Sequence, residues 1–512
     1  MMINRSIIVF RYILCCLLLP GIAASVISAE PTAPVYSRLW GQSGEKFDPF
    51  GRMPDYSFAG YHFGEEALPH VEVATDVTRF GAIGDGNTDC TPAFIKAIET
   101  TKRGAITIPP GRYLIRDILW IRKPNIVLRG AGPEKTVLHI LTELQDVRPN
   151  MGTTTSGRPT SNYSWSGGFL WLQGRINQSR LAQIITPAAR GSHTLILDKE
   201  VNLKAGQRVQ VAMKDNAQKS LLNYLYSGDP GDTAKINRPV HVAMVSRVLS
   251  VAGKTIILER PLWFDVRPEW KPQLMTFQPT VSEVGIEDLA IEFPVKPYAG
   301  HFTERGMNGI AMTRVADCWV RNVRISNSDS GLFLGTSCTA KGLVLDSQRT
   351  PDAKHNSTGH HGISLGRDCL LVNFDIRTRF IHDITVGNLN TGNVVKNGSA
   401  VSLSLDHHKR APYQNLFCNL DVGDGKRLWN CGGGAQLGKH CGARTTFWAI
   451  RSQQPVGWPP DRFGPDSMTL VGFNSTADSV LSPDGRWFEI IDPYRIKPAD
   501  LHAAQLTRRL AR

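Results

Sequence analysis

The sequence predicts an all-β protein of stacked parallel strands, and two observations support this fold class. Residues 281–452 contain short apolar runs, such as GIEDLAIEF, CWVRNVRIS and AVSLSLD, that are punctuated by Asn, Gly and Asp. No long helical pattern separates these runs, so each is expected to form a short strand of one coil. A chain of 512 residues can bury a large core in this way without disulfide cross-links.

Residues 1–29 have the composition of a secretory signal peptide. A basic start, MMINR, precedes the apolar run SIIVFRYILCCLLLPGIAASV, and small residues follow it. The alternative, an uncleaved membrane anchor, is disfavoured because the apolar run is shorter than a bilayer span. We therefore expect a soluble protein that is secreted or periplasmic.

The charge balance predicts an anionic partner. Loss of Arg5 and Arg11 with the signal peptide takes the formal charge from +13 to +11. An exported basic protein fits an acidic polysaccharide, although a positive excess also serves solubility alone. No nucleic-acid recognition motif is present, so we expect a monomer that binds neither nucleic acid nor membrane.

The rest of the chain divides by composition into five segments. Successive parts are marked by short strands with PPG, KPN and GAG turns between them, then by β-strands with alternating polar and apolar faces, and finally by a terminal helix. We predict an extended N-terminal arm (30–75), an N-terminal β-helix module (76–174), a β-rich inserted subdomain (175–270), β-helix coils with the active site (271–455) and a C-terminal covering segment (456–512).

One stretch of about sixty residues resembles a known family. FGAIGDGNTDCTPAFIKAI, ITIPPGRYLI and IVLRGAG are similar to the first module of the pectate-lyase-like superfamily, with Cys90 where that family usually has Asp. The resemblance implies a right-handed parallel β-helix with a short N-terminal capping helix, here beginning near Thr91 and Pro92. The same module occurs in polysaccharide lyases, glycoside hydrolases and phage tailspikes, so it predicts the fold and leaves the function open.

The cysteines predict neither a zinc ribbon nor a disulfide framework. Seven remain after cleavage, none in a CxxC pair. We expect most of them to be small buried apolar residues, with Cys431 and Cys441 as the nearest candidates for a bond.

Half of the fourteen histidines lie within residues 355–440, among fixed cations and carboxylates. Histidine transfers protons near neutral pH, and a cationic setting suits an anionic substrate. The predicted catalytic residues are His408, His382, Lys409, Arg410, Asp406 and Arg379.

Alternation along the strands assigns some of these side chains to the surface. In Val401–His408, the residues Asp406 and His408 face outward and His407 faces the core. The same rule turns Asp383 and Asp421 outward, which predicts a polar ladder of three aspartates, and leaves His382 at the inward edge of its strand. It also predicts that Leu416, Cys418, Leu420 and Val422 share the inward face of one strand.

Further side chains near the cluster are candidates for substrate binding. Aromatic rings stack on sugars, although they serve equally well as packing at the corners of coils. The predicted substrate-binding residues are His361, His440, Arg444, Tyr413 and Trp429.

No metal site and no cofactor are predicted. No compact group of Asp and Glu resembles a calcium site, and HDI and DHH do not match a common zinc signature. The competing interpretation is a metal held by His382, Asp406 and His408.

Three functions remain open at this point. The first is a polysaccharide lyase that cleaves a uronic-acid polymer by β-elimination, in which a cation neutralises the carboxylate and a histidine removes the C5 proton. The second is a glycoside hydrolase of polygalacturonase-like type, because NSDSG (Asn327, Asp329) and TGHHGISLG faintly resemble that family's motifs. The third, a non-catalytic carbohydrate-binding β-helix protein, is disfavoured by the number of titratable groups.

Overall fold

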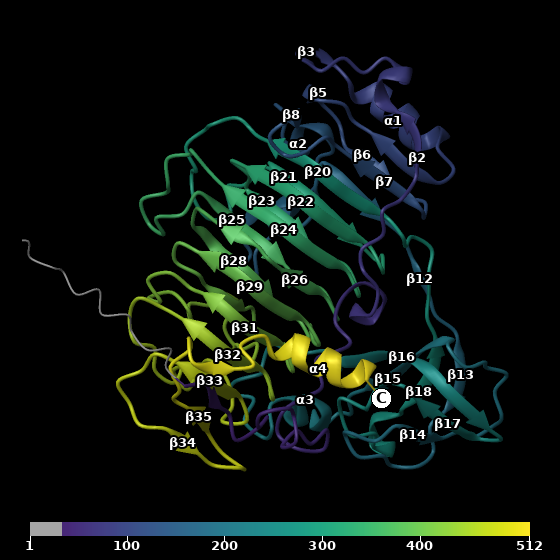
Figure 1. Ribbon diagram of the computed structural model, residues 1–512, viewed down its shortest axis with the longest axis vertical. Helices are drawn as coiled ribbons and strands as arrows, with labels where there is room; N and C mark the ends of the chain where they lie inside the picture. Colours follow the sequence, from purple (N-terminus) through teal and green to yellow (C-terminus); the bar gives the residue numbers. More distant parts are fainter. Residues whose placement is uncertain (1–32, 512) are drawn as a thin grey trace, which may run out of the picture.

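The computed structural model describes residues 33–511, and the predicted signal peptide lies outside the described residues. Figure 1 shows parallel strands stacked in successive coils to form a column, with its N-terminal end at the top and its C-terminal end below. No helix within residues 33–511 is both long enough and apolar enough to cross a membrane. The predicted fold class, an all-β right-handed parallel β-helix, is confirmed.

A seven-stranded parallel sheet forms one long face of the β-helix and carries the site discussed below. Its strands are β6 (Leu119–Ile121), β11 (Leu170–Gln173), β21 (Asn308–Thr313), β23 (Ser330–Phe333), β25 (Gly359–Ser364), β28 (Phe380–Val386) and β30 (Leu405–His407).

The rest of the β-helix wall is one larger sheet, in which nearly all strand pairs are parallel. Its first strands are β2 (Val73–Asp76), β3 (Asp85–Asp89), β4 (Gly104–Thr107), β5 (Gly111–Ile115), β7 (Ile126–Arg129) and β8 (Thr136–Ile140). The later coils add β20 (Gly285–Glu292), β22 (Trp319–Ser326), β24 (Thr339–Asp346), β26 (Leu370–Val372), β27 (Asp375–Ile376), β29 (Val394–Ala400), β31 (Leu416–Asp421) and β32 (Thr446–Arg451).

The parallel coils continue beyond residue 455, where the covering segment was expected to begin. Strand β33 (Thr469–Phe473) pairs in parallel with β32, and β35 (Trp487–Glu489) pairs in parallel with β33. The short strand β34 (Val480–Leu481) then folds back on β35 in the antiparallel sense.

A left-handed residue bends several of the strands in the larger sheet. Asn322, Asn397 and Asn419 have φ between 52° and 54°, a conformation that Asn tolerates better than most residues. The Asn419 amide also donates to Asn397 on the preceding coil at 2.8 Å. Such a bend interrupts the alternation of side chains, so patterns on either side of it must be read separately.

The bend at Asn419 overturns one prediction. Leu420 lies in the main core, but Leu416 and Cys418 pack outside the β-helix wall, against the arm and the last helix. The prediction that these residues share the inward face is therefore wrong for Leu416 and Cys418.

The predicted capping helix is confirmed as α1 (Thr91–Thr100), with Pro92 in its first turn. Phe94, Ala97 and Ile98 of this helix join the core of the coils and close its N-terminal end, at the top of Figure 1. The other helices are α2 (Leu144–Val147), α3 (Ser220–Leu225), α4 (Leu501–Leu510) and the short η1 (Tyr61–Gly64), η2 (Val77–Phe80), η3 (Asn162–Ser164) and η4 (Pro268–Trp270).

The β-rich insertion is an antiparallel sheet with a hydrophobic core of its own, at the lower right of Figure 1. A buried ion pair joins it to the coils, because the Arg260 guanidinium donates to Asp368 at 2.9 Å and stacks on Trp263. Its strands are β13 (Arg180–Gln183), β14 (Thr194–Ile196), β15 (Arg208–Lys214), β16 (His241–Ala252), β17 (Thr255–Leu258) and β18 (Gln273–Thr276). The two-stranded pairings β9 (Met151–Thr153) with β10 (Pro159–Ser161) and β12 (Ile176–Asn177) with β19 (Gln278–Pro279) lie outside the main sheets.

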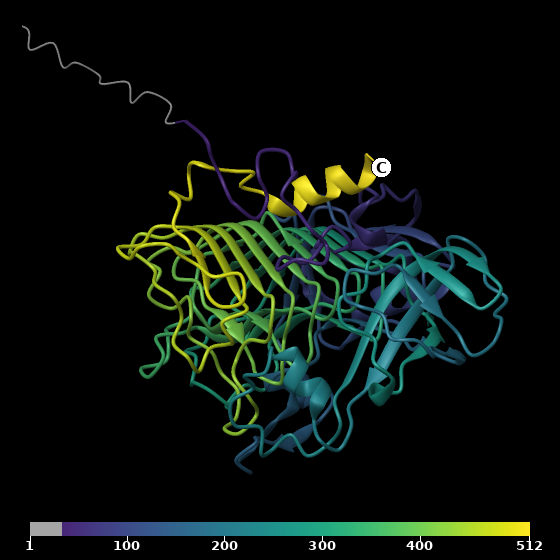
Figure 2. The ribbon, with the colours of Figure 1, turned by 90° about the horizontal axis from the view of Figure 1, so that it is seen from below.

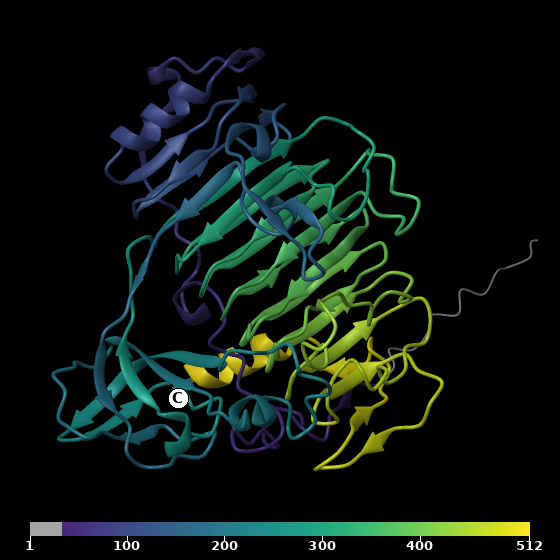
Figure 3. The same cartoon turned by 180° about the vertical axis from the view of Figure 1, so that it is seen from behind.

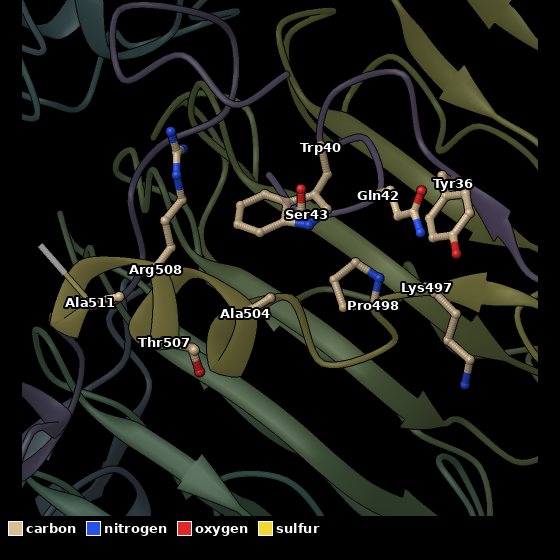
Figure 4. A pocket seen from close by; sticks show the side chains of 10 residues that line it. All are labelled: Tyr36, Trp40, Gln42, Ser43, Lys497, Pro498, Ala504, Thr507, Arg508 and Ala511. Atoms are coloured by element: carbon tan, nitrogen blue, oxygen red, sulfur yellow. The ribbon is translucent and has the colours of Figure 1, made fainter. Parts of the chain in front are cut away.

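The N-terminal arm and α4 cover the outer face of the larger sheet (Figure 2). Strand β1 (Val35–Tyr36) of the arm pairs in parallel with β36 (Ile496–Lys497) near the end of the chain. A pocket of about 710 Å³ lies at this seam. Figure 4 shows its side chains, with Trp40 of the arm facing Pro498 and α4. Lys497 and Arg508 are its charged side chains.

The cysteines lie as the sequence predicted for most of them. All seven within the described residues are free, and only Cys431 is not fully buried. The candidate bond between Cys431 and Cys441 is therefore absent from the described chain.

Candidate active site

A cavity of about 1040 Å³ lies over the outer surface of the seven-stranded sheet. Six histidines line it, together with the cations Lys235 and Arg410, and none of its lining residues within 33–511 is Asp or Glu. Thr153–Ser156 of the β9–β10 hairpin form part of its wall, and Figure 3 shows this hairpin in blue, crossing over the green strands. The lining histidines are His301, His355, His360, His361, His382 and His408.

The register of the sheet aligns Asp406 with polar residues on the two preceding coils. Ser364 pairs with Thr385, and Thr385 pairs with Asp406, so these side chains follow one another on neighbouring coils. Their strand neighbours Ile363, Ile384 and Leu405 point into the core.

Asp406 lies directly behind the cavity and orients His408. One oxygen of its carboxylate, Oδ2, is 2.8 Å from Nδ1 of His408 and accepts from Thr385 at 3.2 Å. The other oxygen accepts the backbone N–H of Gly432 at 2.7 Å. With Nδ1 turned to the carboxylate, Nε2 is left as the free nitrogen of the His408 ring.

The electrostatics of this pair favour a charged carboxylate beside a basic imidazole. Burial acts to raise the pKa of Asp406, but His382, His408 and the Gly432 N–H together hold it well below its usual range. Burial acts to lower the pKa of His408, but attraction to Asp406 and the hydrogen bond between them raise it overall. Asp406 thus remains an acceptor throughout the physiological range.

The other histidines of the cavity form a packed group. His360 and His361 stack at 4.1 Å between ring centroids, and the His361 and His382 centroids are 5.0 Å apart. Burial is the main cause that lowers the pKa of His382 and of His301 to about 4. Burial likewise places the pKa of His360 and of His361 well below the ordinary value, so these rings are neutral near pH 7.

A second carboxylate, Glu304, lies behind His360. Its Oε1 is 3.5 Å from Nδ1 of His360 and also accepts a hydrogen bond from the Tyr298 hydroxyl. Burial raises the pKa of Glu304 to about 7.

The segment CGGGAQLG closes over the imidazoles. A Cβ atom at Gly432 would lie 2.6 Å from Cε1 of His382 and 2.7 Å from Cε1 of His408, so only glycine fits there. Gly433 has φ of 102°, which glycine adopts without strain. The tight turn predicted for this segment thus brings backbone against the rings.

The structure brings together one part of the predicted site. His408, His382, His361 and Arg410 line the cavity, with Asp406 immediately behind them. Lys409 follows His408 with a left-handed backbone and lies against Gly433, outside the lining.

Five predicted site residues lie elsewhere, and their placement there is a correction. Arg379 is not among the lining residues and pairs with Asp424 at 3.4 Å, while His440 contacts the carbonyl of His407 through Nδ1. Arg444 lies over the Tyr224 ring of the insertion. The two aromatic residues pack in cores, Tyr413 in that of the insertion and Trp429 against Phe447 and Phe463.

The predicted ladder of three aspartates is also wrong. Asp383 is buried, accepts from the Phe380 and Ser404 backbone and lies 3.2 Å from Arg427. Asp421 is exposed on β31, which belongs to the larger sheet. His382, placed at the inward edge of its strand by the sequence, instead lines the cavity. His407 faces the core, as the alternation predicted, with its ring 5.0 Å from that of Phe463.

Of the two motifs that suggested a polygalacturonase, TGHHGISLG contributes His360 and His361 to the cavity lining, whereas Asn327 and Asp329 of NSDSG are structural. Asp329 is buried, pairs with Arg349 at 2.9 Å and accepts the backbone N–H groups of Gly306 and Met307. The Asn327 amide donates to the carbonyl of Phe293. Neither residue lines the cavity.

Sequence reasoning missed His301, Phe302, Glu304 and His360 as members of the site. His301, Phe302 and Glu304 lie in the connection before β21, which has no strand pattern, and only the fold brings it against β25 and β28. The one available signal was the pair His360–His361 at the start of a strand, of which only His361 was predicted as a site residue.

Comparisons with known proteins agree with this fold. Residues 74–230 match the family model described as "Rhamnogalacturonase A/epimerase, pectate lyase-like". No curated protein matches the chain.

Three solved structures match most of this chain at low identity. The tailspike protein gp49 from Pseudomonas phage LKA1 is 14% identical, with a TM-score of 0.48 over 78% of this chain and 63% of its own, so the match spans less than two thirds of that tailspike. An exopolygalacturonase from Thermotoga maritima is 10% identical, with a TM-score of 0.33 over 80% of this chain and 73% of its own. An alginate lyase from Paenibacillus sp. is 10% identical, with a TM-score of 0.34 over 81% of this chain and 97% of its own.

Identities this low say nothing of activity. The family match covers the N-terminal module and part of the insertion, and it includes the segment whose motifs carried the resemblance. The resemblance of this chain to the pectate-lyase-like superfamily of parallel β-helices is thus confirmed.

Proposed function

We propose that this protein is a carbohydrate-active enzyme that cleaves a uronic-acid-containing polysaccharide by β-elimination. The family match over residues 74–230 supports a carbohydrate substrate. The observation that carries the proposal is the Asp406–His408 pair at a cavity lined by cations and histidines and without a lining carboxylate among residues 33–511.

The proposed reaction uses His408 as the base. Nε2 of His408 takes the C5 proton of the uronate, and the electron pair of that C–H bond forms a C4=C5 double bond. The C4–O glycosidic bond breaks, and the leaving oxygen takes up a proton from an imidazole or water in the cavity. Asp406 fixes the ring and stabilises the imidazolium that forms, as a buried carboxylate does beside a catalytic histidine.

Arg410 supplies the positive charge that this reaction needs. Arg410 belongs to the cavity lining, and Lys235 of the insertion is a second cationic residue of the same lining. A cation at the substrate carboxylate stabilises the charge that develops when the C5 proton is removed.

Hydrolysis receives less support from the geometry. It requires two carboxyl groups on either side of the scissile bond. Asp406 and Glu304 both lie behind imidazole rings, and no Asp or Glu among the described residues lines the cavity.

Incubation with polygalacturonate, alginate and glycosaminoglycans tests the proposal. We expect ultraviolet absorbance from the conjugated double bond to rise together with new reducing ends on at least one polymer. New reducing ends without that absorbance would show hydrolysis instead. Binding of the polymers without any cleavage would show a carbohydrate-binding protein, and either result overturns the proposal.

A further inference from the structure

Three histidine rings converge within the cavity from separate parts of the chain. His301 comes from the connection before β21, His360 from β25 and His382 from β28. One nitrogen of each ring lies within 4.8 Å of one nitrogen of both others. The His301 and His360 ring centroids are 4.4 Å apart, and those of His360 and His382 are 5.4 Å apart.

Two of these rings have a carboxylate behind them. Nδ1 of His360 is 3.5 Å from Glu304, and Nδ1 of His382 is 3.4 Å from Asp406. Both Nδ1 atoms are buried and have no hydrogen-bond partner. A carboxylate at one ring nitrogen is the usual support of a metal-binding histidine, because it orients the ring and leaves the other nitrogen for the ion.

We infer that His301, His360 and His382 bind a divalent transition-metal ion such as Zn²⁺. Three imidazole nitrogens suit zinc and its neighbours, whereas calcium and magnesium prefer oxygen ligands. A catalytic zinc site with three protein ligands keeps its fourth position open, and because all three histidines line the cavity, that position would face it.

A second set of three groups, His382, Asp406 and His408, meets the same distance condition. His382 belongs to both sets and serves only one ion. In the second set the Asp406 carboxylate already accepts from His408, Thr385 and Gly432. A metal there would break the hydrogen bond that orients His408. In the first set the Nδ1 atoms of His360 and His382, which face Glu304 and Asp406, make no hydrogen bond that an ion on the other ring nitrogens would disturb, so we assign the ion to it.

The ion has a role in the proposed reaction, and that role alone rests on the proposed function. Its open position would take a carboxylate oxygen of the substrate next to His408, whose ring centroid is 5.1 Å from that of His382. The metal would thus share with Arg410 the neutralisation of the uronate.

Calorimetry and cobalt spectroscopy test the metal site without an activity assay. The purified protein is stripped with a chelator and titrated with Zn²⁺, and Co²⁺ is then used to observe the visible absorption of a nitrogen-coordinated ion. We expect a single ion per chain. His301→Ala should weaken binding more than about 100-fold, and Glu304→Gln about 10- to 100-fold through loss of the carboxylate behind His360.

Two variants serve as matched controls. His355 lines the same cavity outside the set and already pairs with Asp352 at 2.9 Å, so His355→Ala should keep the affinity for Zn²⁺. His408→Ala should keep it as well. Circular dichroism and Tm of the metal-free forms show that each variant is folded.

Three results would overturn the inference: no bound ion in the wild type, unchanged affinity in folded His301→Ala, or loss of affinity in His408→Ala, which would place the ion on the second set. The metal site and the lyase proposal fail separately. A chain that binds Zn²⁺ but releases no unsaturated product supports the site and contradicts only the lyase. A lyase that binds no ion contradicts only the site.

Discussion

Asp406 holds His408 through a hydrogen bond of 2.8 Å between Oδ2 and Nδ1, from a position where the carboxylate itself is wholly buried. The carboxylate is therefore not available to the substrate, whereas the His408 ring lines the cavity. In the proposed reaction the two residues have different roles, because Asp406 sets the orientation and charge of the ring and His408 contacts the substrate. This division distinguishes the site from a pair of exposed carboxylates.

The first prediction concerns this pair. His408→Ala should lower kcat about 10²- to 10⁴-fold, because it removes the general base. Asp406→Asn should lower kcat to a similar extent while the fold persists, because an amide has nearly the same shape but cannot stabilise the imidazolium. Initial rates of double-bond absorbance measure both effects. His241→Ala, at an exposed position of β16, is the control and should keep the wild-type rate.

Retention of more than half the wild-type kcat in folded His408→Ala would contradict this assignment. A large loss in His408→Ala with none in Asp406→Asn would leave the base in place and reject the role given to Asp406.

The second prediction separates two arginines that the sequence grouped together. Arg410 lines the cavity, whereas Arg379 pairs with Asp424 outside it. Arg410→Ala should lower kcat/KM about 10- to 100-fold, the value of a charge-assisted hydrogen bond to the substrate carboxylate. Arg379→Ala should change kcat/KM less than about 2-fold, because surface pairs contribute little. Equal losses in the two variants would contradict the placement of Arg410 at the substrate.

The fold was predictable because its signals are local. The motif from Phe80 to Gly132 encodes a turn, the capping helix and short strands in consecutive residues, and the later strands are recognisable as apolar runs. Alternation within one straight strand was also sufficient to predict that Asp406 faces outward and His407 inward.

The parts that failed depend on bends and on long-range packing. The left-handed Asn419 reverses the faces of β31, so alternation counted through it places Leu416 and Cys418 on the wrong side. His301 reaches the cavity only because coils far apart in sequence stack beside it. Tyr413 is a core residue because the insertion packs on it, and no local sequence pattern predicts this contact.

The third prediction is a pH dependence in the attachment of the N-terminal arm. Nε2 of His62 is 2.7 Å from Glu283, and this hydrogen bond is the main cause that raises the pKa of His62 to about 9. Burial acts to raise the pKa of Glu283, but His62 and Tyr61 lower it overall. A raised histidine pKa stabilises the fold fully below the ordinary value of 6.5, and this stabilisation is lost as the pH rises through about 9.

The difference in Tm between the wild type and His62→Gln measures this effect. It should be largest near pH 6 and should vanish near pH 10, because the wild-type ring is then neutral. A difference that stays constant over this range would show that the contact works without charge.

The fourth prediction concerns the contact that fixes the insertion to the coils. Arg260 and Asp368 are both buried, and burial is the main cause that raises the pKa of Asp368 and lowers that of Arg260. Asp368→Ala leaves the guanidinium buried without its partner, so the free energy of unfolding should fall by about 3–5 kcal/mol. The exposed pair Arg377–Asp375 is the matched control, and Asp375→Ala should cost no more than about 1 kcal/mol. Urea denaturation followed by tryptophan fluorescence measures both. Equal midpoints for the two variants would mean that the hydrophobic contacts of Trp263 and Tyr413 hold the insertion without help from the ion pair.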